Sequence, residues 1–466
     1  MTKYQNSTIL LARITNLFTN NMSAFFCVIT KNDTFNISAY EKAFDELSHR
    51  GNVSTHQVAE PIFLGYKMYS HSKLETFIKI ENDQIIAKRD FFGEQTLFVF
   101  ENIDILIISS EYRAILSLID LDINSDVLET YMHTRHLVVL RDALYCGVQQ
   151  ILPGETWTIN LNTFDKKIDV ENVYSLFDVN LTENFKTRSE ESLIDELDEL
   201  MKLSIKNIIP NDKFASVVSG GVDSTLVSHY VKNMTDTFLS INHKDKDYVT
   251  YENVSEYFNV KCKVLYEKEW SQKLNYIYKH LKSPLFSHSS VGCYFLSLLA
   301  KQNECEVLLT GDAADAVVYG GKNLSDYEMS LYNQYKDAKY DHIEKPITLH
   351  LYIPQTVCLE SDMLGKMNQV DFRSPFLNKD LLRFTLNLPI KYRYNLEVDK
   401  HMREKYLLKK LFIKYFSEEK ILPKQGFSGY PNESKKYMNV DIKHEDRDVE
   451  WKLLNLEYFY RSRNDI

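Results

Sequence analysis

The stretch Ser219-Gly220-Gly221-Val222-Asp223-Ser224 decides the fold of the carboxyl-terminal part of this chain. It follows an apolar run, Phe214 to Val218, and precedes an amphipathic run, Thr225 to Val231. A β-branched run, a glycine pair and a helical pattern predict a strand, a tight turn and a helix. Such a turn directs backbone N–H groups and the N-terminus of a helix at an anion. The sequence therefore predicts a phosphate-binding loop, with a plain Gly-Gly chain reversal as the alternative.

The spacing of this loop separates it from two commoner phosphate-binding motifs. It lacks the lysine of Gly-x-x-x-x-Gly-Lys-Ser/Thr and the three glycines of Gly-x-Gly-x-x-Gly. It resembles the S-G-G-x-D-S loop of the ATP pyrophosphatases, which cut ATP between its α- and β-phosphates. The resemblance implies an ATP site made of Ser219, Gly220, Gly221, Asp223, Ser224 and Ser240. In it the glycines let the backbone approach the pyrophosphate, the serines add hydroxyl donors and Asp223 holds Mg²⁺.

The composition is that of a folded protein with a sizeable core. The chain has 466 residues, 44% of them hydrophobic, and a net charge of −10. Its length favours two domains, with a third left open. The acidic balance argues against nucleic acid as the main partner, because that affinity rests on lysine and arginine meeting phosphates. The six cysteines lack Cys-x-x-Cys spacing, which favours free thiols in a reducing cytosol over a zinc site or a disulfide framework.

The first residues carry no convincing targeting signal. Arg13 interrupts their apolar run and no small-residue cleavage site follows, so we expect no signal peptide. No apolar run approaches the ~20 residues that a membrane helix needs, and we expect a cytoplasmic protein. Residues 1–21 are interpreted as an extension, with Met22 as an alternative start ahead of the first strand.

Two patterns divide the rest of the chain. From Met22 to about Thr163 strand-like runs dominate, with helical runs from Ser38 to Leu47 and after Ser110. This pattern predicts a sheet-rich α+β domain, assigned to residues 22–186. The expected strands are Phe25 to Thr30, Ile62 to Tyr66, Thr76 to Ile80, Gln84 to Ala87, Thr96 to Phe100, Ile103 to Ser109 and Thr156 to Ile159. A polar connector, Glu171 to Lys186, is expected to end this part.

Over residues 187–466 strands and helices alternate. An acidic helix with apolar residues at Leu193, Leu197 and Leu200 comes first. Further strands are expected at Phe238 to Ile241, Lys261 to Tyr266 and Val307 to Leu309. This alternation is typical of a doubly wound parallel sheet, so we expect an α/β domain here.

A second acidic motif, Thr310-Gly311-Asp312-Ala313-Ala314-Asp315, follows the last of these strands. Ligands of open α/β sheets bind at the carboxyl ends of the strands. Two acids three residues apart would share one face of a helical turn, so one could bind metal while the other handles a proton or substrate. An acidic helix cap is the alternative interpretation.

Five ordered landmarks resemble the asparagine synthetase family. The loop at Ser219 is similar to that family's ATP loop, and residues 310–315 are similar to its S-G-E-G-A-D segment. Asp362 to Leu377 aligns without gaps on D-R-M-S-M-A-x-G-x-E-x-R-x-P-F-L. Pro423-Lys424-Gln425-Gly426-Phe427 resembles the lysine-containing segment that closes the synthetase site, and Lys405-Tyr406-Leu407-Leu408 resembles the helix that precedes it.

This resemblance implies an ATP-dependent amide ligase. A carboxylate attacks the α-phosphate of ATP, forms an acyl-adenylate and expels pyrophosphate. Mg²⁺ on Asp223 and Asp315, together with Lys424, would stabilise the leaving group. An amine then attacks, and Asp312 takes its surplus proton. The remaining implied contacts are Gly311 and Lys424 to ATP, and Asp312, Asp315, Ser289 and Arg373 to substrate.

Asp312 stands where the family usually has glutamate. The shorter side chain places its carboxyl group differently, and small displacements in an active site cost large factors in rate. The resemblance therefore leaves the identity of the substrates open.

The amino-terminal part resembles the family's glutaminase domain, an N-terminal nucleophile (Ntn) sandwich, in reduced form. Ser48-His49-Arg50-Gly51 matches S-H-R-G, and Arg89 to Phe98 is similar to R-D-x-x-G-x-x-P-L-Y. If Met22 corresponds to the family start, Ser23 takes the place of the nucleophilic cysteine and is a far weaker nucleophile. Cys27 is expected to be a buried thiol in a strand. We therefore expect no glutaminase activity.

The sequence thus predicts an AMP-forming ligase that uses ATP and Mg²⁺. Its partners would be a small-molecule or peptide carboxylate and ammonia or an amine, without nucleic acid or membrane. Open alternatives are an ammonia-dependent asparagine synthetase, an intramolecular lactam- or peptide-cyclising ligase, a nucleotide-binding pseudoenzyme and an RNA-modifying enzyme with the same loop. Homodimers are common in the family, and the sequence does not decide this.

Overall fold

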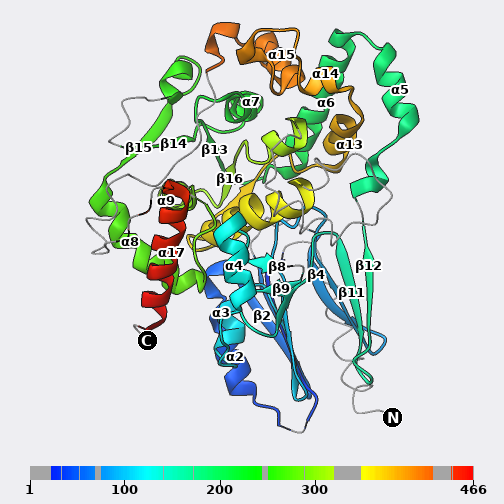
Figure 1. Cartoon of the computed structure of the whole chain (residues 1–466), viewed down its shortest axis with the longest axis vertical. Helices are drawn as coiled ribbons and strands as arrows, with labels where there is room; N and C mark the ends of the chain where they lie inside the picture. The colour runs from blue at the N-terminus through cyan, green and yellow to red at the C-terminus, as the bar shows by residue number, and fades with distance from the viewer. Residues whose placement is uncertain are drawn as a thin grey trace.

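A computed structural model places most of the chain. It describes residues 22–32, 34–51, 53–68, 75–139, 141–171, 173–243, 250–287, 289–319, 348–422, 442, 444 and 446–464. Figure 1 shows two antiparallel sheets in the lower part of the molecule and a parallel sheet with its helices above them.

The larger antiparallel sheet has eight strands in the order β2-β3-β1-β7-β6-β10-β9-β8. These strands are β1 (Met22–Thr30), β2 (Val53–Ala59), β3 (Ile62–Met68), β6 (Phe98–Glu101), β7 (Ile105–Ser109), β8 (Val138–Val139), β9 (Asp142–Ala143) and β10 (Val148–Gln150). Strand β1 lies inside the sheet, between β3 and β7, and every one of its residues is buried. Its sequence is apolar on both faces for that reason.

The second antiparallel sheet has four strands in the order β12-β11-β5-β4. They are β4 (Phe77–Glu81), β5 (Gln84–Lys88), β11 (Glu155–Asn160) and β12 (Lys166–Val170). Phe25, Cys27 and Ile29 of β1 join a core with Ile78 and Trp157 of this sheet. The two sheets therefore pack face to face. The assignment of this arrangement to the glutaminase (Ntn) type stays a prediction.

Helices cover the other face of the eight-stranded sheet. They are α2 (Ile37–Asp45), the short 3-10 turn η1 (Ser48–Arg50), α3 (Tyr112–Leu116) and α4 (Ser125–Thr134). Ala24, Phe26 and Val28, the alternate residues of β1, pack into a core that also contains Ile277 and Met363. Because these last two belong to the carboxyl-terminal part, the two parts of the chain share one core.

The third sheet is parallel, with five strands in the order β15-β14-β13-β16-β17. The strands are β13 (Ala215–Val217), β14 (Phe238–His243), β15 (Val260–Leu265), β16 (Val307–Leu309) and β17 (Asp371–Arg373). This confirms the α/β layout expected for this part. The last strand, β17, was not predicted, because its sequence Asp371-Phe372-Arg373 has one apolar residue between two charged ones and so lacks an apolar run.

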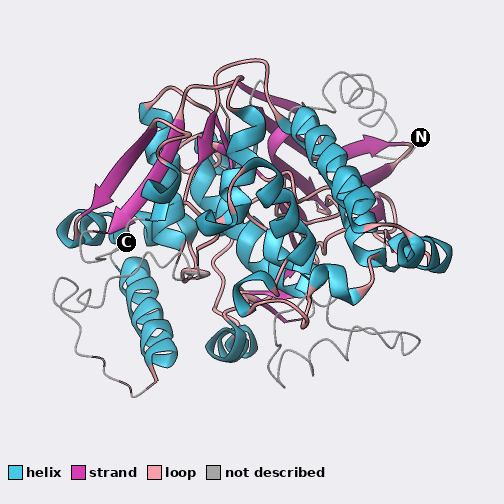
Figure 2. Ribbon diagram, turned by 90° about the horizontal axis from the view of Figure 1, so that it is seen from above, coloured by secondary structure: helices cyan, strands magenta, loops and turns pink. Residues whose placement is uncertain are grey.

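Helices lie on both faces of the parallel sheet (Figure 2). The helices and short helical segments of this part are η2 (Val173–Leu176), α5 (Val179–Thr187), α6 (Glu190–Ile208), α7 (Val222–Val231), η3 (Thr250–Val254), α8 (Glu267–Leu281), α9 (Ser290–Gln302), α12 (Leu359–Lys366), α13 (Lys379–Asn387), α14 (Ile390–Arg393), η6 (Lys400–Met402), α15 (Tyr406–Tyr415), η7 (Glu418–Lys420) and α17 (Arg447–Asn464). Two further segments, η4 (Asp315–Tyr319) and η5 (Thr348–Cys358), are π-helical.

Several expectations on secondary structure were wrong. The polar connector from Glu171 to Lys186 contains η2 and α5, and Asp178 caps α5 by accepting from the N–H groups of Asn180 and Leu181. Strands β2 and β12 were missed because they lie at sheet edges with exposed, mostly polar side chains. The division of domains at residue 186 stays a prediction.

Two further findings concern the state of the cysteines and the length and hydropathy of the helices. All six cysteines lie within the described residues and none is in a disulfide. Cys27 is buried in β1, where burial raises the pKa of its thiol to about 12. In the described ranges, no helix is both long and apolar enough to cross a bilayer.

Candidate active site

The predicted phosphate-binding loop joins β13 to α7 as expected. Gly220 has a φ of +84°, a left-handed conformation that glycine adopts without strain, and Gly221 precedes the first residue of α7. The Ser219 and Ser224 hydroxyls lie 2.8 Å apart, and the Ser219 N–H donates to Ser224 Oγ over 3.1 Å. The two serines thus close the loop on itself at the start of a helix, which is a geometry suited to anions.

The second motif lies directly against this loop. A Cβ atom on Gly311 would stand 2.7 Å from the Ser224 nitrogen and 2.9 Å from Asp223 Cβ. Only glycine leaves room for this approach, because real Cβ contacts are not that short. Gly311 therefore brings the end of β16 onto the loop that follows β13.

Lys405 lies between the two carboxylates that the sequence assigned to Mg²⁺. Its Nζ is 2.5 Å from Asp223 Oδ2 and 2.8 Å from Asp315 Oδ1. Burial alone would lower the pKa of Lys405, but the two carboxylates raise it above its ordinary value. The structure thus gathers Asp223, Asp315 and a buried cation beside the loop.

Asp312 is the first carboxylate of the second motif and is partly buried. It accepts a hydrogen bond from Thr310 Oγ1 at 2.8 Å, and its backbone carbonyl accepts one from Ser374 Oγ at 2.6 Å. Burial raises the pKa of Asp312; the Thr310 hydrogen bond opposes this rise and the charge of Asp223 adds to it. The hydroxyls of Thr310 and Ser374 therefore fix both ends of this residue.

Asp312 and Asp315 do not share a helix face, so that expectation was wrong. Ala313 has a φ of +64°, and the helical segment η4 begins only at Asp315. The backbone turn separates the partly buried Asp312 from Asp315, which is exposed and bound to Lys405. A left-handed alanine is rare and leaves no signature in a hydrophobic pattern.

A buried carboxyl that the sequence did not single out contacts Ser289. Glu360, on α12, accepts from Ser287 Oγ at 2.9 Å and from Ser289 Oγ at 3.2 Å. Burial raises the pKa of Glu360 to about 7, although the serine hydrogen bonds lower it. Ser289 itself is the residue before α9. The predicted substrate residue therefore belongs to a serine-carboxyl network.

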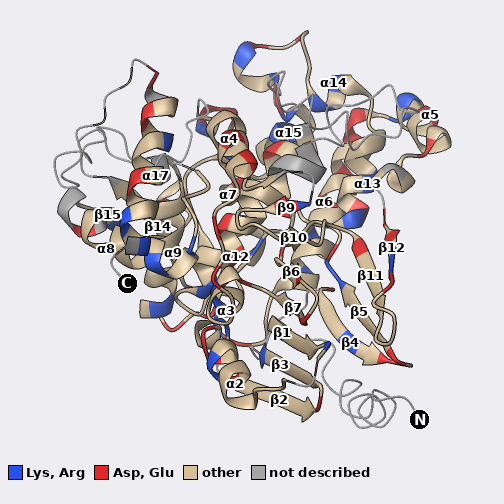
Figure 3. Ribbon diagram, turned by 60° about the horizontal axis from the view of Figure 1, so that its bottom comes forward, with Lys and Arg blue, Asp and Glu red and all other residues tan. Residues whose placement is uncertain are grey.

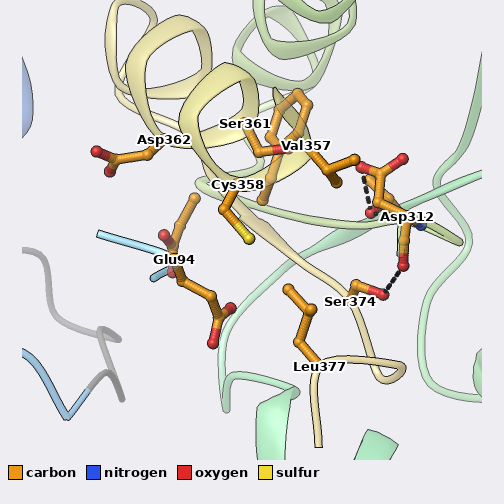
Figure 4. A pocket seen from close by; sticks show the side chains of 11 residues that line it. Glu94, Asp312, Val357, Cys358, Ser361, Asp362, Ser374 and Leu377 are labelled. Atoms are coloured by element: carbon orange, nitrogen blue, oxygen red, sulfur yellow. Dashed lines mark hydrogen bonds between the residues drawn. The ribbon is translucent and has the colours of Figure 1, made fainter. Parts of the chain in front are cut away.

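A small cavity of about 30 Å³ lies next to Asp312 (Figure 4). Its lining residues are Glu94, Thr310, Asp312, Val357, Cys358, Ser361, Asp362, Asp371, Phe372, Ser374 and Leu377. Glu94 comes from the amino-terminal part, and burial raises the pKa of its carboxyl well above the ordinary value. The cavity therefore lies where the two parts of the chain meet.

Two other predicted residues are held by protein groups. Arg373 donates from Nε to Asp371 at 2.8 Å and from Nη1 to the carbonyl of Ile208 at 2.5 Å. Ser240 is buried in β14, opposite Cys262 of β15. Lys424 lies outside the described residues, so its assigned role stays a prediction.

Ser23, at the position assigned to the lost nucleophile, is fully buried in β1. Its hydroxyl donates to the backbone carbonyl of Arg50 and lies 3.1 Å from that of Lys67. Its own carbonyl accepts from Arg50 Nε at 3.0 Å. The hydroxyl is therefore surrounded by protein acceptors.

Comparisons with known proteins identify the family of this chain. Fold and loop define the chain as an α/β protein with a glycine loop at the start of a helix, at the carboxyl edge of its parallel sheet. The asparagine synthase family model matches residues 196–343 and 334–462, which together span more than half of the chain. The chain therefore belongs to the asparagine synthase family.

One curated relative comes from Methanocaldococcus jannaschii and bears the name "Putative asparagine synthetase (glutamine-hydrolyzing) 1". It is 25% identical over 313 residues, which are 66% of this chain. The match covers 53% of that relative, so the chain spans about half the length of the protein it matches.

Proposed function

We propose that this protein activates a carboxylate with ATP, releases pyrophosphate, and transfers the acyl group from AMP to ammonia or an amine. The observation that carries the proposal is the position of Lys405. Its ammonium contacts Asp223 after β13 and Asp315 after β16, beside the loop at Ser219. A cation and two carboxylates at this edge suit a nucleotide and its metal.

The pyrophosphate end of the reaction would use these groups. Mg²⁺ is usually bound by one or two carboxylates and completed by phosphates and water, and Asp223 with Asp315 supply such a pair. Bound there, Mg²⁺ would neutralise charge on the pyrophosphate. Lys405 and the backbone N–H groups of the loop would stabilise the same charge as it develops. These donors are already in place before the reaction, so no free energy is needed to reorient them as the charge develops.

The acyl-transfer end would use Asp312 and Glu360. An attacking amine must lose a proton, and a carboxyl group with a raised pKa accepts it more readily than an ordinary one. Asp312 lies on the cavity, and Glu360 joins Ser289 on the neighbouring helices. Ammonia or an amine would be the nucleophile.

Glutamine is not the proposed nitrogen donor. The relative's name includes glutamine hydrolysis, but Ser23 here is buried against two carbonyl groups. An attacking hydroxyl needs a base and room for an amide, and these contacts supply neither. Acidic and basic residues are interspersed along the described helices (Figure 3), which favours small-molecule partners over nucleic acid.

The test is exchange of labelled pyrophosphate into ATP, measured with a panel of amino acids and other small carboxylates. We expect exchange that depends on one carboxylate and is lost in Asp223→Ala. The matched control is Asp195→Ala, because Asp195 is an exposed aspartate on α6 that pairs with Lys414. ATP binding without exchange under any carboxylate would contradict the ligase proposal and leave a nucleotide-binding protein.

A further inference from the structure

A buried arginine joins the two parts of the chain beside the proposed site. Arg50 is 0% exposed, at the end of η1 in the amino-terminal part. Its Nη2 forms an ion pair with Asp362 of α12, and its Nη1 lies 2.7 Å from Glu111 Oε1. Its Nε donates to the Ser23 carbonyl. Its Nη1 also lies 3.8 Å from the Met363 sulfur, so the guanidinium contacts four protein groups. Two of them, Asp362 and Met363, belong to α12, more than 300 residues away in the chain.

The helix that Arg50 reaches forms a wall of the proposed site. Asp362 and Ser361, in the first turn of α12, line the cavity beside Asp312. Glu360, one residue earlier, accepts the hydrogen bonds of Ser287 and Ser289. Figure 4 shows Asp362 and Glu94 on one side of this cavity and Asp312 on the other. Whatever fixes the first turn of α12 also fixes these groups.

We propose that Arg50 is a positioning residue of the ligase, which holds the first turn of α12 through Asp362 and so places Ser361 and Glu360 for the acyl-transfer step. The inference rests on the proposed function. It makes the amino-terminal part a working component of the ligase, although its own nucleophile is lost.

The energetics of a buried ion pair support this role over plain stabilisation. Taking two charges out of water costs about as much as their attraction returns, so well-packed apolar side chains often stabilise a fold equally well. What the pair adds is direction, because the planar guanidinium bonds Glu111 and Asp362 at fixed angles. The ion pair thereby fixes the position of the first turn of α12 relative to η1.

The two carboxylate partners of Arg50 provide a matched test. Their side chains are 5% exposed in Glu111 and 2% exposed in Asp362, but only Asp362 belongs to α12. Five variants are compared: Arg50→Met, Asp362→Asn, the double variant of these two, Glu111→Gln and Arg50→Lys. Amide formation is followed with ammonium chloride and the carboxylate found by pyrophosphate exchange, alongside thermal unfolding and hydrogen exchange of residues 359–366.

If Arg50 positions α12, Arg50→Met and Asp362→Asn each slow kcat for amide formation by about 10- to 100-fold, and the double variant is no slower than the worse single one. Glu111→Gln keeps kcat within about twofold despite a similar loss of thermal stability. Amides of α12 exchange faster in the first three variants only. Arg50→Lys, which keeps one ion pair, retains more turnover than Arg50→Met.

Three results would overturn the inference. If kcat falls in proportion to thermal stability in every variant, including Glu111→Gln, the Arg50–Asp362 ion pair has a structural role only. If kcat for amide formation falls in Asp362→Asn but is unchanged in Arg50→Met, Asp362 has a direct role and Arg50 has none. If no carboxylate supports exchange in the unaltered protein, the proposed function fails, and unchanged hydrogen exchange of α12 in Arg50→Met would then separately refute the inference.

Discussion

The ammonium group of Lys405 lies 2.5 Å from the carboxylate of Asp223, although 182 residues separate them in the chain. Lys405 has a φ of +50° and stands immediately before α15, whereas Asp223 lies in the first turn of α7. Two helix starts are thus joined by an ion pair beside the Gly-Gly loop. Asp315 is the second carboxylate that contacts Lys405, so one positive and two negative side chains lie beside the loop.

We expect Lys405→Met to reduce carboxylate-dependent pyrophosphate exchange by roughly 100-fold or more, because it removes a cation from the leaving group. Steady-state exchange at saturating ATP measures this loss. Lys414→Met is the control, since Lys414 lies further along the same helix and pairs with Asp195 and Asp198 away from the loop. Equal activity in both variants would exclude a role for Lys405.

Gly311→Ala should abolish nucleotide binding and destabilise the fold by about 1–3 kcal/mol, because its Cβ would overlap the backbone of the loop. Isothermal titration with ATP and urea unfolding measure the two effects. Gly147→Ala is the control for the loss of stability. Gly147 has a φ of +77° in the amino-terminal part, so alanine there lowers stability without affecting nucleotide binding. Normal ATP affinity in Gly311→Ala would refute the close approach of β16 to the loop.

Glu360 should make stability fall as pH rises. Its pKa is about 7 in the folded protein against an ordinary value of 4.5, so the folded state binds the proton more tightly than the unfolded state. Both states are protonated below the unfolded value, and the penalty grows between about pH 4.5 and 7 and then stays constant. Relative to the unaltered protein, Glu360→Gln should gain up to about 3 kcal/mol between pH 5 and pH 8.

Urea unfolding at a series of pH values measures this difference. A stability difference between Glu360→Gln and the unaltered protein that does not change with pH would show that Glu360 titrates normally. The loss of hydrogen bonds with Ser287 and Ser289 changes stability at every pH and is therefore separate from the slope.

Ser23→Cys should not create glutaminase activity, even though a thiol is the better nucleophile. The side chain at position 23 is fully buried and faces the carbonyl groups of Arg50 and Lys67. Release of ammonia from glutamine is the measurement. Hydrolysis above the background of the unaltered protein would show that the position is accessible to substrate.

Local pattern was sufficient to predict most of the secondary structure near the site. The strand, glycine turn and helix around Ser219 appear where expected, because β-branched runs and glycine pairs act through local backbone preferences. The family resemblance assigned Asp223 and Asp315 to one Mg²⁺, and the structure brings both carboxylates to Lys405, although binding of Mg²⁺ stays a prediction.

Long-range contacts escaped prediction. The sequence places Lys405 in a segment that resembles a family helix, and nothing local shows that its ammonium reaches two carboxylates. Glu360 belongs to no recognisable sequence motif. Burial raises its pKa, and that burial exists only because α12 packs against α9 in the tertiary structure. The left-handed turn at Ala313, which separates Asp312 from Asp315, follows two residues after Gly311, the glycine that contacts the loop.

The central claim is that ATP is cleaved at the α-phosphate to activate a carboxylate. The most direct measurement is the identity of the products from ATP, separated chromatographically after incubation with Mg²⁺, the accepted carboxylate and ammonium chloride. The account predicts AMP and pyrophosphate in equal amounts, formed only when the carboxylate is present and not in Asp223→Ala. ADP and inorganic phosphate, or AMP formation that is independent of any carboxylate, would contradict it.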